Sequence, residues 1–95
     1  MKDIYQLSLD EIDAEVARIE GISGADNFSP TRNWAHGGPI IEREKIELLC
    51  FNSHPYQWEA QMCGGSYMGG GTPLIAAMRE LVSTKSKSAN HFELF

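Results

Sequence analysis

The feature that most constrains the fold is a run of three glycines, 69–71, which leads through Thr72 and Pro73 into an apolar helical pattern. Glycine tolerates backbone conformations closed to other residues, and threonine can cap a helix. Proline suits the first helical position, because its missing N–H would be unpaired there anyway. The pattern therefore predicts a loop followed by a helix over residues 73–85. The stripe that we expect to be buried contains Leu74, Ala77, Met78 and Leu81.

The start of such a helix could hold an anion. Its first N–H groups lack partners within the helix, and the helix dipole is positive there. These are the conditions under which phosphate groups bind to proteins. A simpler interpretation, in which Thr72 merely caps a surface helix, explains the same residues. We expect a second helix start of this type near residues 39–44, where Pro39 follows Gly38.

A first amphipathic helix is predicted over residues 8–20. Ser8 and Glu11 have the spacing of a capping box, and Gly21 is placed to end the helix. The predicted apolar face consists of Leu9, Ile12, Val16 and Ile19.

The middle of the chain predicts an antiparallel hairpin over residues 46–63. Strand patterns at 46–51 and 56–63 flank a turn at 52–55, and residues 66–68 could add a third strand. One face of the second strand would carry Tyr56, Trp58, Ala60 and Met62.

The predicted fold is a small single α+β domain spanning residues 1–95. A two- to three-stranded antiparallel sheet would pack against the two main helices, with a short helix near 39–44. We expect flexible ends at residues 1–6 and 86–95.

The net charge of −5 and the pI of about 5.0 argue against binding to DNA or RNA polymers, which needs a positive field. No segment approaches the length of about 20 apolar residues that crosses a membrane, and no signal peptide is evident. Cys50 and Cys63 lack metal-site spacing. We expect buried free thiols, although a disulfide stays open.

Nothing in the sequence resembles a catalytic or metal-binding motif, so we expect no enzyme, no catalytic residue, no metal and no cofactor. Of the three histidines, His54 falls at the hairpin tip and His91 in the tail. His36, beside two glycines, is the one worth testing.

Residues 22–37 contain many turn formers and read as a long loop. Loops of this length in small domains are often functional. Trp34 within it either anchors the loop to the core or offers a flat surface to a ligand.

Several of these segments together resemble a known family. They are Asn33-Trp34-Ala35-His36-Gly37-Gly38-Pro39-Ile40-Ile41-Glu42, Ile46, Trp58-Glu59-Ala60, Gly71-Thr72-Pro73-Leu74-Ile75-Ala76-Ala77-Met78-Arg79, Val82 and Thr84-Lys85. The combination resembles the phage NinX-like family of small proteins, in which an acidic residue precedes the tryptophan where this chain has Asn33. The resemblance implies a phage or prophage origin, hence the cytoplasm of an infected or lysogenic bacterium, and implies no particular reaction.

These observations favour a protein that binds an anionic, nucleotide-like small molecule, such as a sponge that sequesters a nucleotide-derived signal of host immunity. Indole rings would stack on a base, and helix starts would hold phosphate. We expect a homo-oligomer, since pockets in small domains often form between subunits. The candidate ligand-binding residues are Asn33, Trp34, His36, Gly38, Pro39, Trp58, Gly71, Thr72 and Arg79.

The alternative is an inhibitor or accessory factor that binds a host protein. The acidic balance and the apolar end of the tail, residues 92–95, favour it.

Overall fold

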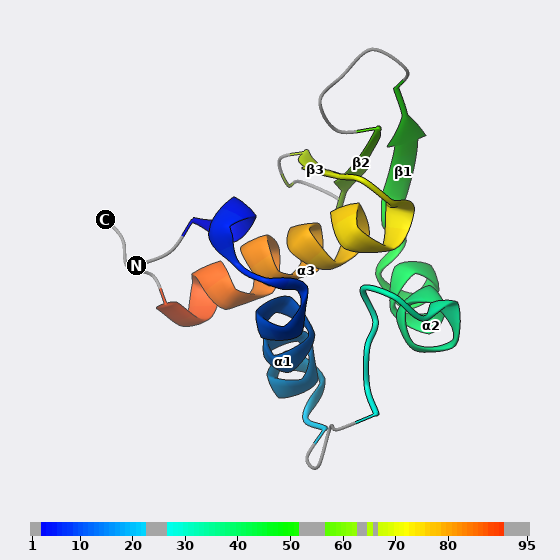
Figure 1. Cartoon of the computed structure of the whole chain (residues 1–95). Helices are drawn as coiled ribbons and strands as arrows, with labels where there is room; N and C mark the ends of the chain where they lie inside the picture. The colour runs from blue at the N-terminus through cyan, green and yellow to red at the C-terminus, as the bar shows by residue number, and fades with distance from the viewer. Residues whose placement is uncertain (1–2, 23–26, 52–56, 63–64, 66, 91–95) are drawn as a thin grey trace.

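The computed structural model describes residues 3–22, 27–51, 57–62, 65 and 67–90. They form an α+β fold of three helices and a three-stranded sheet (Figure 1). In chain order the elements are η1 (Ile4–Gln6, a 3-10 turn), α1 (Leu9–Glu20), α2 (Trp34–Glu44), β1 (Glu47–Cys50), β2 (Trp58–Gln61), β3 (Met68–Gly70) and α3 (Pro73–Asn90).

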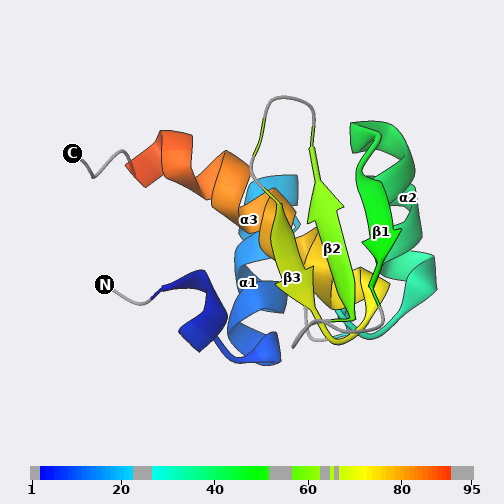
Figure 2. The ribbon, with the colours of Figure 1, turned by 90° about the horizontal axis from the view of Figure 1, so that it is seen from above.

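The helix α3 lies at the centre of the molecule, between the sheet and α1 (Figures 1 and 2). Ala76, Ala77, Met78 and Leu81 are fully buried on it, so the first half of α3 is apolar on most sides. A helix with this pattern needs partners on several sides, and here α1, α2 and the sheet provide them.

A buried carboxylate also joins α3 to the sheet. Glu80 is almost fully buried, and its Oε2 accepts a hydrogen bond from the N–H of Met62 at 2.9 Å. A Cβ at Gly65 would overlap this oxygen, so the chain after β2 needs a glycine there.

The sheet is an antiparallel meander with the order β1-β2-β3. Leu48 lies opposite Ala60, which in turn lies opposite Met68. Ala60 is fully buried, whereas Glu59 on the other face is partly exposed. One face therefore packs on α3, and Figure 2 shows the sheet in front of the helices.

The helix α1 is built as its sequence predicts. The Ser8 hydroxyl accepts a hydrogen bond from the N–H of Glu11, and the Glu11 carboxylate accepts one from the N–H of Ser8. Gly21 ends the helix in the left-handed conformation, with φ at 72°. Ile12 and Val16 are fully buried against the core.

Several predicted boundaries were wrong. The helix expected near 39–44 begins five residues earlier, at Trp34, so the loop expected to reach residue 37 ends at Asn33. Gly69 and Gly70 belong to β3 rather than to a loop, because they pair with Glu59 and Trp58. The last helix continues past residue 85 to Asn90.

The expected state of one cysteine was also wrong. Cys50 is a free cysteine, but it is exposed at the end of β1 instead of buried. Cys63, Tyr56, the hairpin tip at 52–55 with His54, and the tail from 91 with His91 lie outside the described residues.

Candidate functional site

The start of α2 is capped by Asn33. The side-chain oxygen of Asn33 accepts a hydrogen bond from the N–H of Ala35 at 2.9 Å. Its backbone carbonyl accepts from the N–H groups of His36 at 3.0 Å and Gly37 at 2.9 Å. The N–H groups of Ala35, His36 and Gly37 are therefore used within the chain, and they are not available to hold an anion.

Pro39 occupies the sixth position of α2 rather than the first. At that position proline removes one hydrogen bond of the helix instead of sparing an unpaired N–H. The prediction of a helix start at Pro39 was wrong, because Asn33, a better capping residue, lies one and a half turns earlier.

Trp34 lies on the surface at the start of α2. The residue is 53% exposed, which excludes the interpretation that it anchors the loop in the core. A Cβ placed on Gly38 would lie 3.7 Å from Cε3 of the indole, so the ring lies against this part of the helix surface. Trp34 therefore presents an exposed aromatic surface supported by the helix.

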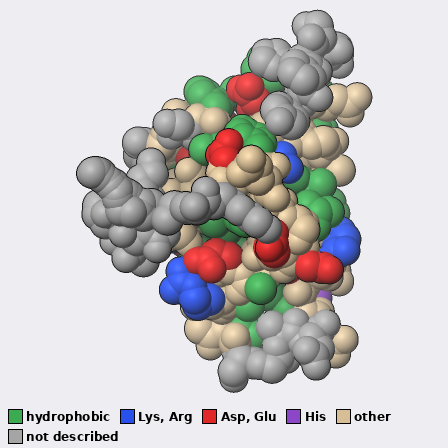
Figure 3. Space-filling view, turned by 60° about the vertical axis from the view of Figure 1, so that its left-hand side comes forward, with side chains coloured by type: hydrophobic (Ala, Val, Ile, Leu, Met, Phe, Trp, Pro, Cys, Tyr) green, Lys and Arg blue, Asp and Glu red, His purple; other side chains and the backbone are tan. Residues whose placement is uncertain are grey.

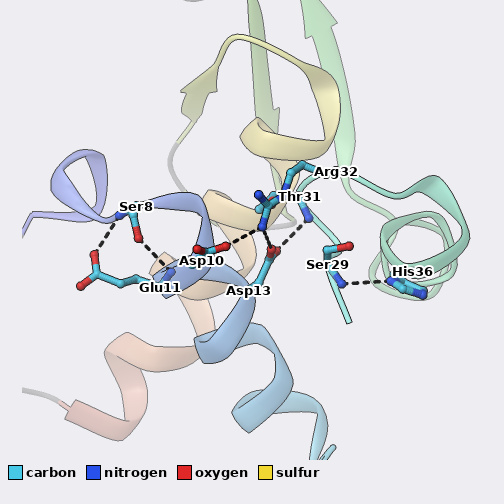
Figure 4. Close-up of polar contacts among 8 residues, drawn as sticks. All are labelled: Ser8, Asp10, Glu11, Asp13, Ser29, Thr31, Arg32 and His36. Carbon is cyan, nitrogen blue, oxygen red and sulfur yellow. Dashed lines mark hydrogen bonds and ion pairs between the residues drawn. The ribbon is translucent and has the colours of Figure 1, made fainter. Parts of the chain in front are cut away.

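His36 is engaged in holding the preceding loop. Its Nδ1 accepts a hydrogen bond from the N–H of Ser29 at 3.0 Å (Figure 4), and its ring stacks on Phe28 with centroids 5.3 Å apart. These contacts explain a half-buried histidine beside two glycines without a ligand.

The same loop is fastened to α1 by charged groups (Figure 4). Buried Asp13 accepts a hydrogen bond from the N–H of Thr31 at 3.0 Å and pairs with Arg32, also at 3.0 Å. Arg32 reaches Asp10 as well, at 2.7 Å. The long loop is thus held in place where it passes α1, which sequence reasoning missed because the partners are about twenty residues apart.

The start of α3 has the predicted form. Pro73 is its first residue, and the Thr72 hydroxyl accepts a hydrogen bond from the N–H of Ile75 at 3.1 Å. The carbonyl of Thr72 accepts from the N–H of Ala76 at 3.0 Å. Only Leu74 in this first turn carries an N–H that neither Thr72 contact uses.

Arg79 closes the outer edge of β3. Its Nη1 donates to the carbonyl of Gly69 at 2.8 Å, and its guanidinium lies over the Tyr5 ring, 5.0 Å from the centroid. The Tyr5 hydroxyl accepts from the N–H of Gly69 at 2.8 Å. These contacts explain why the Arg79 side chain lies at this edge. In the sequence, only the aromatic character of Tyr5 indicates such a contact.

The remaining candidates occupy different places. Trp58 is partly buried against the core and lies opposite Gly70 in the sheet. Gly71 is exposed, and a Cβ there would meet nothing within 4 Å. Gly37, which was not a candidate, lies where the first turns of α2 and α3 approach each other closely. A Cβ there would lie 2.6 Å from Cδ2 of Leu74. Five predicted residues, Asn33, Trp34, His36, Gly38 and Pro39, therefore lie at or within α2, which contacts α3 at Leu74.

Ion pairs link the far end of α2 to α1. The guanidinium of Arg43 donates to both carboxylate oxygens of Glu20, each at 2.8 Å. This pair lowers the pKa of Glu20 and raises the pKa of Arg43. On the face seen in Figure 3, basic, acidic and apolar side chains of the described residues are interspersed.

The described residues contain no group of three histidine, cysteine or acidic side chains that could hold a metal ion. In those same ranges, none of the helices combines the length and the apolar character that a membrane crossing requires.

Comparison with known proteins adds the family. The model of the family described as Bacteriophage P22, NinX matches residues 10–85, which covers most of the chain. A search of the curated proteins found no match. The match includes every candidate residue, and the chain belongs to the NinX family of phage proteins.

Proposed function

We propose that this NinX-family protein acts by binding a protein of its bacterial host, in the cytoplasm of an infected or lysogenic cell. The observation that carries the proposal is the surface of α2 around Trp34. There this residue, 53% exposed, lies beside backbone N–H groups that the chain itself has bound.

Tryptophan is among the residues that contribute most to protein interfaces, because its large rigid ring loses little entropy on burial. The helix supports the ring from behind, and Gly37 fixes that helix against α3. A rigid tryptophan on an ordered element is the kind of side chain that is enriched among the residues contributing most to protein interfaces.

The experiment is capture of host proteins from a lysate by the purified chain, with Trp34→Ala as the test variant. Tyr67→Ala is the matched control, since Tyr67 is also an exposed aromatic residue, 46% exposed, but precedes β3. We expect a stoichiometric partner that binds the wild type and the control and is lost from Trp34→Ala. A partner retained by Trp34→Ala, or none at all, contradicts the proposal.

The second candidate is the sequestration of a nucleotide-like anion that signals host immunity. One observation favours it: neither α2 nor α3 carries an acidic residue in its first turn, so no carboxylate there offsets the positive end of either dipole. The two starts adjoin where Gly37 meets Leu74. An indole for a base and the start of α3 for a phosphate would then lie on one side of the molecule.

Titration calorimetry with cyclic nucleotides and ADP-ribose separates the two candidates. Sequestration requires heat of binding for a member of this panel, weakened by Trp34→Ala and by Thr72→Ala but unchanged by Tyr67→Ala. If a ligand binds and none of these variants changes its heat of binding, the ligand binds elsewhere on the protein. If no member of the panel gives heat of binding, sequestration of these signals is rejected.

A further inference from the structure

The two outer edges of the sheet differ in how their backbone groups are used. On β3, both outward groups of Gly69 are occupied, the N–H by the Tyr5 hydroxyl and the carbonyl by Arg79, each at 2.8 Å. Side chains thus close this edge against another strand.

The edge formed by β1 is open. The N–H of Phe51 donates to the carbonyl of Gln57 at 2.7 Å, and in an antiparallel ladder alternate residues face the same neighbour. Leu49 and Phe51 therefore face β2, whereas the N–H and carbonyl groups of Leu48 and Cys50 point outward. In the part of the chain that the structure describes, no hydrogen bond uses those outward groups.

The open edge also lacks the residues that usually prevent pairing. Soluble proteins protect edge strands by keeping them very short, or with proline, charged side chains such as lysine, a bulge or a covering element. The strand Glu47–Cys50 is short, but it contains neither proline nor lysine, its only charge is at Glu47, and Cys50 at its far end is exposed. Figure 1 shows β1 at the outside of the sheet, extending away from α2.

We infer that two copies of the chain pair through β1, antiparallel and about a two-fold axis that passes beside Leu49. The result is one continuous sheet with three strands from each copy. Each strand supplies the outward donors and acceptors that the other needs, so the interface is self-complementary, as two-fold symmetry requires.

The charge of Glu47 and the apolar residues of the strand favour one register for this pairing. With Leu49 opposite the second copy's Leu49, the outward groups of Leu48 face those of Cys50 in the other copy, and every one of them is paired. Glu47 then lies opposite Phe51. A shift that sets the two Glu47 carboxylates opposite each other would bring like charges together and is disfavoured.

The closed edge explains why the assembly stops at two copies. Once the β1 edges are paired, the new sheet ends on both sides in β3, where Tyr5 and Arg79 occupy the outward groups. A chain with two open edges would instead extend into fibres.

The first experiment measures the mass of the full chain by analytical ultracentrifugation over a concentration series. Cys50→Pro removes an outward N–H and no hydrogen bond of the β1–β2 ladder, while Cys50→Ser keeps the N–H and is the matched control. We expect a dimer for the wild type and the control. The dissociation constant of Cys50→Pro should rise at least about tenfold, because each dimer loses two hydrogen bonds.

The second experiment does not depend on Cys50→Pro folding. In a chain whose Cys50 and Cys63 are replaced by serine, Leu49→Cys places thiols opposite each other in a pair whose Cβ atoms approach within reach of a disulfide. We expect diamide, which accepts the two hydrogens of the thiols, to link the chains into covalent dimers. Glu59→Cys lies on the same face but on β2, and diamide should not link this variant into covalent dimers.

Two results would overturn self-pairing. One is a monomer at all concentrations together with slow or absent linkage of Leu49→Cys. The other is a dimer that neither Cys50→Pro weakens nor Leu49→Cys traps. If the Leu48 and Cys50 amides become protected from exchange only when a host protein is added, the edge accepts a foreign strand, and the symmetric pairing is rejected.

Discussion

The helices α2 and α3 offer a direct comparison, because glycine and proline stand next to or near each other in or just before the early part of both. In α3 the proline is the first helical residue and the glycines stand before it. In α2 the proline is the sixth residue, and Gly37 and Gly38 lie inside the helix. The same residue types thus stand at the start of one helix and inside the other.

The comparison shows that the capping side chain decides where each helix begins. Thr72 accepts from the N–H of Ile75, and Asn33 accepts from the N–H of Ala35. Proline is compatible with a start but does not create one, since it contributes no hydrogen bond. Gly37 and Gly70 leave no room for a Cβ, so glycine at these two positions allows close packing against α3.

The largest effect is expected from glycines that leave no room for a Cβ. In Gly70→Ala the new Cβ would lie 2.5 Å from the backbone nitrogen of Ala76, so β3 and α3 must separate. We expect a loss of about 2–3 kcal/mol in the free energy of unfolding, measured by urea denaturation. Gly71→Ala, with nothing within 4 Å, is the control and should change little.

Gly37 and Gly38 on α2 offer the same comparison between a glycine that leaves no room for a Cβ and one that does. Gly37→Ala brings a Cβ within 2.6 Å of the Pro30 carbonyl oxygen and of Leu74. We expect it to destabilise by about 2 kcal/mol despite the gain in helix propensity. Gly38→Ala has only an ordinary contact with Trp34 and should stabilise by about 0.5–1 kcal/mol. Equal effects at both positions would mean that Gly37 does not set the distance between α2 and α3.

The two prolines should respond in opposite directions. Pro39→Ala restores an N–H to the interior of α2, and we expect a gain of about 1 kcal/mol or more. Pro73→Ala loses a residue suited to the first position and frees the unfolded chain, so a loss of about 0.5 kcal/mol is expected. Thermal unfolding of both variants, monitored by circular dichroism, checks the sign. If Pro73→Ala were more stable than the wild type, the conclusion that Pro73 favours the start of α3 would be wrong.

Local patterns predicted α1, the start of α3 and the alternation of β2, because these elements depend on residues a few positions apart. The pair Ser8 and Glu11 forms the expected capping box, and Ala60 and Met62 are buried on the expected face. Such features depend on backbone geometry that is the same in every protein.

The candidate site could be predicted only in part, because its contacts are made between distant segments. Nothing near Arg79 in the sequence indicates that Tyr5 and Gly69 would engage it. The start of α2 was missed for a local reason: Pro39 was given more weight than Asn33, although asparagine is a strong capping residue. The open edge of β1 follows from strand order, which periodicity alone does not reveal.

The capping residues should show intermediate effects. Asn33→Ala leaves the N–H of Ala35 without its partner, and Thr72→Ala does the same for Ile75. We expect each to cost about 1 kcal/mol, measured by urea denaturation. Asn33→Asp and Thr72→Ser keep the capping oxygen and should recover most of the loss. If Asn33→Ala had no effect, the cap would not be what begins α2.

The smallest effect concerns the far end of α2, where Arg43 pairs with Glu20 at 2.8 Å. The hydrogen bond from Arg43 lowers the pKa of Glu20 from its ordinary value of 4.5. Because the folded pKa is the lower one, this contribution to stability is present above pH 4.5 and is lost as the pH falls through the lowered pKa.

We therefore expect Arg43→Met to be less stable than the wild type by a roughly constant amount, below about 1 kcal/mol, between pH 5 and pH 7. The difference should shrink as the pH falls below 4.5, where Glu20 becomes protonated in the unfolded chain first. Urea denaturation across this range measures it, and Lys45→Met, which lies just after α2, is the control. A difference that stays constant down to pH 3 would show that Arg43 acts through packing rather than through its charge.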